Sequence, residues 1–216
     1  MRKKREFLRQ RFFQQINRVR MENLRSRISP HFTFNVLGRE INQFNGSEEV
    51  KHNLMELVKY LRRSLELTEK LSVSLQDELD FVRTYIELER GRVGEDFVAT
   101  ITVEDGLDAT RIMIPSMIVQ IPVENAIKHG LAGKDGKKEL MVYVSRETNG
   151  IRITVTDNGR GYLPQVVSAT RGTGTGLKVL YQTIQLLNTK NKSDKIRFNI
   201  TNRSDGQTGT QVSVYI

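Results

Sequence analysis

A histidine that directly follows a proline is the first feature of this 216-residue chain whose chemistry stands out. Residues 29–35 read Ser-Pro-His-Phe-Thr-Phe-Asn and lie inside a long apolar pattern typical of a helix. Pro30 removes a backbone donor and clashes with the carbonyl group of Ser26, which costs a helix about 3 kcal/mol. Histidine has an ordinary pKa of about 6.5, so its ring offers a neutral nucleophilic nitrogen near neutral pH. These features predict that His31 accepts a phosphoryl group.

A second group of polar residues ends a predicted helix and reads Glu-Asn-Ala-Ile-Lys-His-Gly at 124–130. Asn125 and His129 lie four residues apart and share one helix face, while Glu124 and Lys128 share the neighbouring face. An amide oxygen that faces a pocket can bind Mg²⁺, so Asn125 is a candidate metal ligand. The alternative is an ordinary helix end, in which Lys128 and His129 face the helix dipole before a glycine cap.

A third motif, Asp-Asn-Gly-Arg-Gly at 157–161, follows a predicted strand over residues 151–156. Strand alternation places Asp157 on the face that carries three apolar side chains, at the edge of the core. A buried carboxylate needs a donor, for which the amino group of adenine is one candidate. Gly159 and Gly161 would let a flat base approach the backbone. The alternative is a plain turn.

Glycines alternate with threonines at residues 172–176, just before a predicted helix over residues 175–187. Glycines at a helix start expose backbone donors and the positive end of the dipole to phosphate, so Gly174 and Gly176 are candidates for this contact. The segment matches neither a dinucleotide fingerprint nor a Walker loop. On its own, such a loop identifies no ligand.

The composition narrows the possible classes of protein. A hydrophobic content of 38% is enough for packed cores, and the absence of cysteine excludes disulfides and thiolate metal sites. The longest apolar stretch, residues 112–123, is too short and too interrupted to cross a bilayer, and no signal peptide is recognisable. We therefore expect the chain as given to be soluble.

The net charge of +9 is concentrated at the start, where residues 1–30 hold ten Lys and Arg against two Glu. Such a segment can be a solvated helix face, a nucleic-acid-binding surface, or a stretch just inside a membrane span. The aromatic residues among these charges, Phe7, Phe12 and Phe13, fit an apolar helix stripe better than a base-stacking platform. We therefore expect no direct nucleic-acid binding.

The first part of the chain is predicted to be helical. Apolar residues recur every three to five positions from Leu8 to Phe44, and a second helix follows a turn that ends at Ser47, its predicted N-cap. Ser74 and Asp77 resemble a capping box that opens a third helical run. Two helices joined by a tight turn leave an apolar face, so two copies would form a four-helix bundle and the protein a homodimer.

From Phe97 onward strands and helices mix, and Asn149-Gly150 marks a hairpin. The pattern predicts an α+β fold in two layers, with a helical region over 1–92 and a second domain over 93–216. The expected helices span residues 114–130 and 175–187, and the expected strands span 97–103, 139–146, 151–156, 196–201 and 211–216.

The three motifs of the second domain occur in the same order in the ATP-binding domain of the gyrase, Hsp90, histidine kinase and MutL (GHKL) superfamily, which this region resembles. Residues 29–35 together with 122–130 are similar to the LytS/YehU type of sensor histidine kinase. The resemblance covers about residues 22–216. It implies a dimeric four-helix bundle followed by a two-layer α/β sandwich of the GHKL (Bergerat) type.

The resemblance also implies roles for single residues. His31 would take the γ-phosphate of ATP, Asn125 would hold Mg²⁺, and Asp157 would read adenine. The remaining implied nucleotide contacts are Thr210 beside adenine, Gly159 and Gly161 at the base, Gly174, Gly176 and Leu177 near the phosphates, His129 in the Asn box, and Lys128 and Arg171 as phosphate partners. Residues 162–173 would form a lid.

Two positions depart from the patterns of related families. Ile121 stands where ATP-hydrolysing GHKL proteins keep a glutamate, which argues against efficient water activation. Phe32 stands where many histidine kinases have an acidic residue, so the base that assists His31 is unassigned and Glu124 is a candidate. Asn35, one helical turn after His31, could position a water for dephosphorylation.

The implied activity is ATP-dependent autophosphorylation of His31, followed by transfer to an aspartate of a response regulator, usually one with a LytTR DNA-binding domain. The basic residues 1–5 resemble a segment just inside a membrane, which predicts a cytoplasmic fragment of a bacterial inner-membrane sensor. Two alternatives keep the same fold: a kinase-dead scaffold, and a serine kinase that acts on a partner protein.

Overall fold

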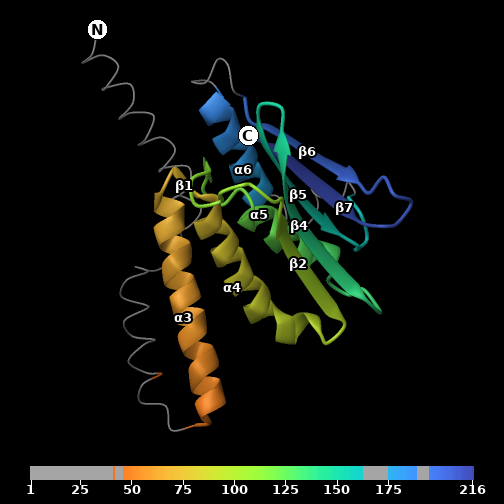
Figure 1. Ribbon diagram of the computed structural model, residues 1–216. Helices are drawn as coiled ribbons and strands as arrows, with labels where there is room; N and C mark the ends of the chain where they lie inside the picture. Colours follow the sequence, from red (N-terminus) through yellow and green to blue (C-terminus); the bar gives the residue numbers. More distant parts are fainter. Residues whose placement is uncertain (1–40, 42–45, 163–174, 189–194) are drawn as a thin grey trace, which may run out of the picture. The chain divides into compact units, whose positions relative to one another are not determined.

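The computed structural model describes residues 41, 46–162, 175–188 and 195–216 (Figure 1). The chain divides into two compact units, residues 1–69 and 70–216. The segment around Pro30 and the predicted first helix, except for Ile41, lie outside the described residues. The kinked helix and the four-helix bundle therefore stay predictions.

The described part of the first unit is mainly one helix, α3 (Glu48–Glu69). The backbone N–H of Val50 donates to the hydroxyl oxygen of Ser47 at 3.3 Å, so the N-cap expected from the sequence is confirmed. Val58 and Leu67 are buried along the helix.

The second unit is built on a five-stranded sheet with the order β2-β4-β5-β7-β6. The strands β2 and β4 are parallel, and all other neighbours are antiparallel. Their bounds are Phe97–Val103 for β2, Lys138–Glu147 for β4, Gly150–Asp157 for β5, Arg197–Asn202 for β6 and Thr210–Tyr215 for β7.

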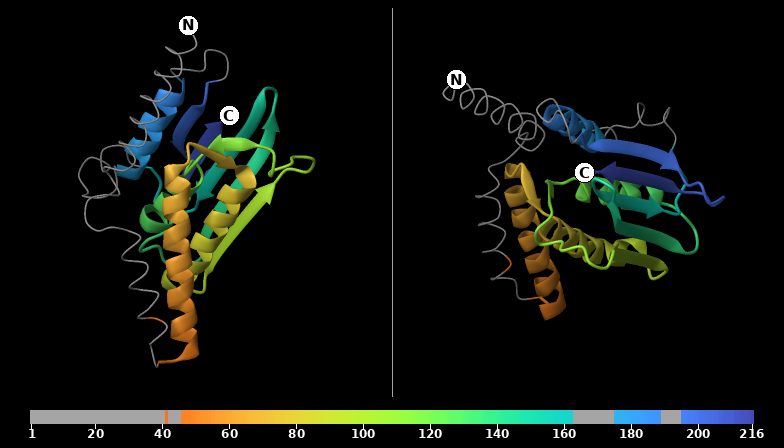
Figure 2. Two further views of the ribbon diagram at one scale, coloured as in Figure 1. Left: turned by 90° about the vertical axis from the view of Figure 1, so that its left-hand side faces the viewer. Right: turned by 45° about the horizontal axis from the view of Figure 1, so that its top comes forward.

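Three helices cover one face of this sheet: α4 (Leu75–Val93), α5 (Gln120–Asn125) and α6 (Thr175–Asn188) (Figures 1 and 2). Alternate strand residues such as Val142 are buried, whereas the intervening Met141 is exposed on the other face. The unit is therefore a two-layer α/β sandwich, which confirms the predicted fold class.

The helix α4 begins where the sequence indicates. Ser74 is its N-cap: the Asp77 N–H donates to the Ser74 hydroxyl at 3.0 Å, and that hydroxyl donates to the Asp77 carboxylate at 2.9 Å. The division into compact units groups α4 with the sheet, whereas the sequence places it in the helical region over 1–92. Which functional region α4 serves stays a prediction.

The helix expected over residues 114–130 begins later than predicted. Its first residues instead form β3 (Met113–Pro115), which pairs with β1 (Ser72–Ser74). The residue before a proline avoids the helical region, so Pro115 favours a strand at its N-terminal side.

The helical part of this segment starts with α5, whose first turn contains Pro122. The N–H groups of a first helical turn have no intrahelical partner, so proline is tolerated there. The helix then widens into one π-helical turn, η1 (Ala126–Gly130), in which Leu131 N donates to the Ala126 carbonyl at 2.8 Å. Pro122 rather than Pro115 therefore marks the helix start.

Candidate active site

Asp157 ends β5 with its side chain in the core, and the residue is only 4% exposed. Its Oδ1 accepts the N–H of Gly159 at 2.8 Å and, more weakly, the N–H of Thr210 at 3.4 Å. Burial raises the pKa of Asp157 above that of an ordinary aspartate, and hydrogen bonds from Gly159 and Thr210 offset part of this shift. A carboxylate in this setting favours a ligand that brings a hydrogen-bond donor.

Glycines surround this carboxylate. A Cβ atom built on Gly130 would lie 2.8 Å from Asp157 Oδ1, one on Gly159 would overlap the Gly130 carbonyl, and one on Gly209 would overlap the Asp157 carbonyl. The sequence suggests a base-lining role for Gly159 but treats Gly130 only as a helix cap. The packing of Gly130 and Gly209 against Asp157 depends on contacts between distant segments, and no local signal in the sequence indicates it.

Hydrogen bonds join the Asp157 turn to the end of η1. The backbone N–H of Arg160 donates to the Gly130 carbonyl at 3.3 Å, and the Arg160 side chain donates to the carbonyl of Ala132 at 3.3 Å. The motifs at residues 124–130 and 157–161, which are separated by β4 and β5, therefore meet at Gly130.

Asn158 holds the same turn to the start of β4. Its Oδ1 accepts the Glu139 N–H at 2.9 Å, and its Nδ2 donates to the Lys137 carbonyl at 3.0 Å. Asn158 is thus a positioning residue that sequence reasoning missed.

Gly161, two residues after Gly159, has a φ of +83°. The following Tyr162 donates its N–H to Asn202 Oδ1 at 2.6 Å.

Asn125 is the last residue of α5 and is half-buried. Its Nδ2 donates to the Ile121 carbonyl at 2.9 Å, which leaves the amide oxygen as the atom suited to a cation. The described residues contain no group of three or more acidic or histidine side chains that could hold a metal. A single amide oxygen fits Mg²⁺, because this ion keeps several waters and takes further ligands from substrate phosphates.

The Lys128 ammonium forms an ion pair with Glu124 one helical turn away. Both side chains are partly exposed, and exposed pairs of this kind contribute about 0–1 kcal/mol. Lys128 can therefore exchange Glu124 for a phosphate at little cost. The neighbouring His129 is half-buried, and its pKa is lowered by burial and then by the charges of Lys128 and Arg160.

The remaining predicted residues fall into two groups. Gly159 and Thr210 donate to Asp157, Gly161 lies beside Asn202 in the same turn, and Gly176 and Leu177 lie in the first turn of α6. The predicted residues outside the described part of the chain are His31, Asn35, Arg171 and Gly174, together with all of the predicted lid except Tyr162.

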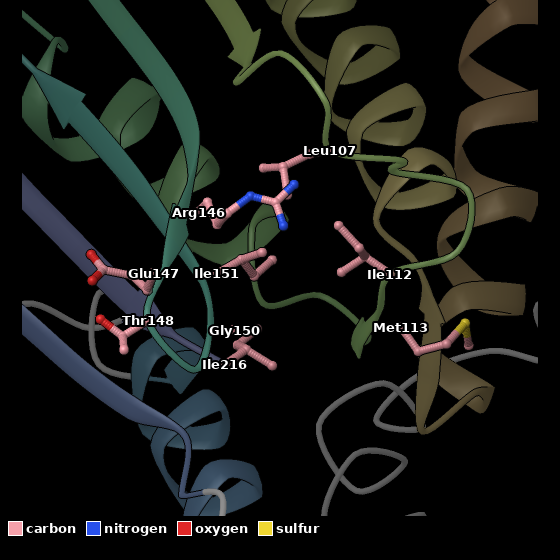
Figure 3. Close-up of a pocket in the computed structure, with 9 residues that line it drawn as sticks. All are labelled: Leu107, Ile112, Met113, Arg146, Glu147, Thr148, Gly150, Ile151 and Ile216. Atoms are coloured by element: carbon pink, nitrogen blue, oxygen red, sulfur yellow. The ribbon is translucent and has the colours of Figure 1, made fainter.

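A pocket of about 500 Å³ lies at the other end of β5, between β3, the β4–β5 hairpin and Ile216 (Figure 3). β5 has eight residues, so its two ends are roughly 23 Å apart. The Arg146 guanidinium at this pocket donates to the Gly106 carbonyl at 3.0 Å. None of the predicted site residues lines the pocket, so it is separate from the Asp157 site.

Two family models match the chain: the histidine kinase model over residues 19–97, and the model of histidine kinase-, DNA gyrase B- and HSP90-like ATPases over residues 110–216. The sensor histidine kinase/phosphatase LytS of Staphylococcus aureus (strain MRSA252) is 32% identical over 84% of this chain and 32% of its own length. The sensor histidine kinase YpdA of Escherichia coli (strain K12) is 29% identical over 79% of this chain and 31% of its own length. The chain thus spans about a third of the length of these curated relatives.

Among solved structures, the histidine kinase domain of the blue-light activated histidine kinase EL346 from Erythrobacter litoralis matches with a TM-score of 0.50. The match covers 86% of this chain and 95% of that one at 16% identity, which shows a shared fold. In the described residues, no helix has the length and apolar character needed to span a bilayer. Because the two models together match most of the sequence, the chain belongs to the histidine kinase family.

Proposed function

We propose that this chain is the kinase core of a two-component sensor: it binds Mg²⁺–ATP, transfers the γ-phosphoryl group to His31, and passes it to an aspartate of a response regulator. The observation that carries the proposal is the buried Asp157 carboxylate, enclosed by glycines and joined to the end of the helix that bears Asn125. Family membership supplies the reaction class.

The geometry at Asp157 supports a role in adenine recognition. The two backbone N–H donors both reach Oδ1, so lone pairs of Oδ2 remain for the exocyclic amino group of adenine. The Thr210 side chain acts with the two backbone N–H groups to lower the pKa of the carboxyl group, which favours its charged, hydrogen-bond-accepting form. Because Gly159 and Gly161 carry no side chain, a flat base can lie against the backbone there.

Phosphoryl transfer needs positioning and charge neutralisation more than covalent help from the protein. The Asn125 amide oxygen is the described group that would hold Mg²⁺, and the bound ion would neutralise charge on the phosphate oxygens. Lys128, released from Glu124, would bind a phosphate oxygen. His31 would attack in line as a neutral imidazole, with Glu124 as the candidate base that takes its proton.

The partners and location belong to the same proposal. We expect a homodimer formed through the helical region, a response regulator of the LytTR type, and attachment to the cytoplasmic side of a bacterial membrane through a preceding sensor region. The names of the relatives, their greater length, and the ten basic residues among the first 30 support this arrangement.

The decisive experiment is incubation of the purified chain with γ-labelled ATP and Mg²⁺, followed by acid and base treatment of the labelled protein. We expect label that acid removes and base preserves, and its loss in His31→Ala with nucleotide binding retained. The matched control is His52→Ala, because His52 is an exposed histidine on α3. Acid-stable label would instead indicate a serine kinase. Nucleotide binding without any label would contradict histidine autophosphorylation and favour a kinase-dead scaffold or a serine kinase that acts only on a partner protein.

A further inference from the structure

Two carboxylates are buried in the described part of the chain, and the proposed function uses only Asp157. The other is Glu78, which has no solvent exposure and lies on α4. A buried carboxylate is costly unless hydrogen bonds compensate it, so its partners indicate its role.

The partners of Glu78 are backbone donors at the start of α5. Oε2 accepts the N–H of Met117 at 3.0 Å, and Oε1 accepts the N–H groups of Val119 at 3.1 Å and Gln120 at 3.2 Å. The first N–H groups of a helix lack intrahelical partners, and Val119 at the N-cap position makes no side-chain cap bond of its own. Glu78 therefore supplies the N-terminal cap of α5 from a different helix, and its negative charge suits that end of the helix dipole.

This cap also holds an unusual backbone conformation. Met117 has a φ of +68°, the one positive φ of a non-glycine residue in the described part of the chain. Such a conformation is strained for a side chain of this kind and persists only where surrounding contacts fix it. The hydrogen bond from Met117 N to Glu78 Oε2 is such a contact.

The segment that Glu78 caps carries the candidate metal ligand. α5 has six residues, about 9 Å of helix, and it ends at Asn125, whose amide is oriented by its bond to Ile121. The far end of the same segment is held separately, at Gly130, by Arg160 and Asp157. The segment thus has two anchors, the Glu78 cap at its start and the Gly130 contacts at its end, and Asn125 lies between them, five residues from Gln120 and five from Gly130.

We propose that Glu78 is a positioning residue that sets the place of the Asn125 amide oxygen at the metal of bound Mg²⁺–ATP, and that it thereby links α4 to the phosphate end of the nucleotide. The proposal rests on the proposed function, because it needs a nucleotide at this site. Glu78 itself does not contact the nucleotide.

The test measures the affinity for a non-hydrolysable ATP analogue by calorimetry, once with Mg²⁺ and once with a chelator. Glu78→Gln keeps the shape but places an amide N–H₂ against backbone N–H groups, so at least one cap bond is lost. We expect the gain in affinity from Mg²⁺ to fall about tenfold, while metal-free affinity stays within about twofold because the Gly130 anchor is intact. The matched control is Glu87→Gln, an exposed carboxylate on the same helix that pairs with Arg90 and should change neither value.

A double variant separates positioning from general loss of stability. Asn125→Ala alone should remove the gain from Mg²⁺, and adding Glu78→Gln should then have no further effect, because both changes act through one ligand. Equal loss of affinity with and without Mg²⁺ in Glu78→Gln, or additive losses in the double variant, would overturn the proposal. If Glu78→Gln fails to fold, the single and double variants are compared in a Met117→Gly background, in which the strained φ of residue 117 is relieved. A wild-type chain with no nucleotide affinity in either condition contradicts the proposed function instead.

Discussion

Gly130 lies directly against the carboxylate of Asp157: a Cβ atom added to Gly130 would stand 2.8 Å from Oδ1 and 3.1 Å from Oδ2. This contact joins the last residue of η1 to the last residue of β5. The helix that carries the candidate metal ligand and the strand that carries the candidate adenine contact are therefore fixed to each other at one point.

Gly130→Ala should weaken the binding of adenine nucleotides at least tenfold. Gly130 is not among the residues with a positive φ, so alanine fits the backbone and the conflict is with the Asp157 side chain alone. The carboxylate must then turn away from the direction that adenine requires. Calorimetry with ADP measures the effect, and Gly91→Ala on α4 is the control because a Cβ there meets no atom within 4 Å. An unchanged affinity would show that the packing of Gly130 has no bearing on recognition.

Asp157→Asn should weaken nucleotide binding but stabilise the free protein at neutral pH. The pKa of Asp157 is raised in the folded chain, so folding favours the protonated carboxyl group. The stability that this group contributes is full below its unfolded pKa of about 3.9 and is lost as the pH rises through the folded value. Because asparagine does not ionise, the variant should gain thermal stability over the wild type as the pH rises from about 4 to 7. Thermal unfolding midpoints of both proteins, measured across this pH range without nucleotide, check this expectation. A stability difference between variant and wild type that shrinks as the pH rises would contradict it.

Glu124→Gln distinguishes two roles of Glu124: the base that assists His31, and the ion-pair partner of Lys128. If Glu124 is the base for His31, the rate of label transfer falls by about 10²-fold or more, a typical contribution of general base catalysis. The affinity for ATP should stay the same or rise, because Lys128 is released to a phosphate. Single-turnover labelling and calorimetry measure the two quantities. An unchanged rate removes Glu124 from the catalytic residues and leaves it as the partner of Lys128.

Asn158→Ala should destabilise the second unit by about 1–3 kcal/mol, since two hydrogen bonds to backbone groups of residues 137 and 139 are lost. Urea unfolding gives the free energy of unfolding. Asn199→Ala, at an exposed position of β6, is the control and should stay close to the wild type. A loss of stability no larger than that of the control would show that the two Asn158 hydrogen bonds contribute nothing to the free energy of unfolding.

Local signals in the sequence predicted much of the fold. The strand Phe97–Val103 has the bounds that its apolar pattern indicates, and Ser47 and Ser74 cap their helices as their residue types suggest. The bounds of the other long strands and of α6 differ by no more than one residue at either end. These elements depend on neighbours within a few positions, and the sequence shows such neighbours directly.

Long-range contacts account for what the sequence did not reveal. The late start of α5 depends on the pairing of β3 with β1 and on the cap from Glu78, which lies about 40 positions earlier in the chain. The short motif at 157–161 indicated Asp157, but nothing local indicated that Gly130 and Gly209 would pack against it. The roles of the metal ligand, the base and the acceptor histidine rest on residue types and on family resemblance, and they stay predictions.

The π-helical turn η1 accommodates the residues between Asn125 and Gly130 that bring Gly130 against Asp157. Its bond from Leu131 to Ala126 spans five residues, whereas an α-helix closes over four. A chain shortened by one residue here would gain a regular helix. The residue in the place of Gly130 would then be rotated away from Asp157, and the motifs at 124–130 and 157–161 would no longer meet. Single-residue insertions and deletions in this turn are therefore a route by which a protein of this fold could keep its shape and lose its nucleotide.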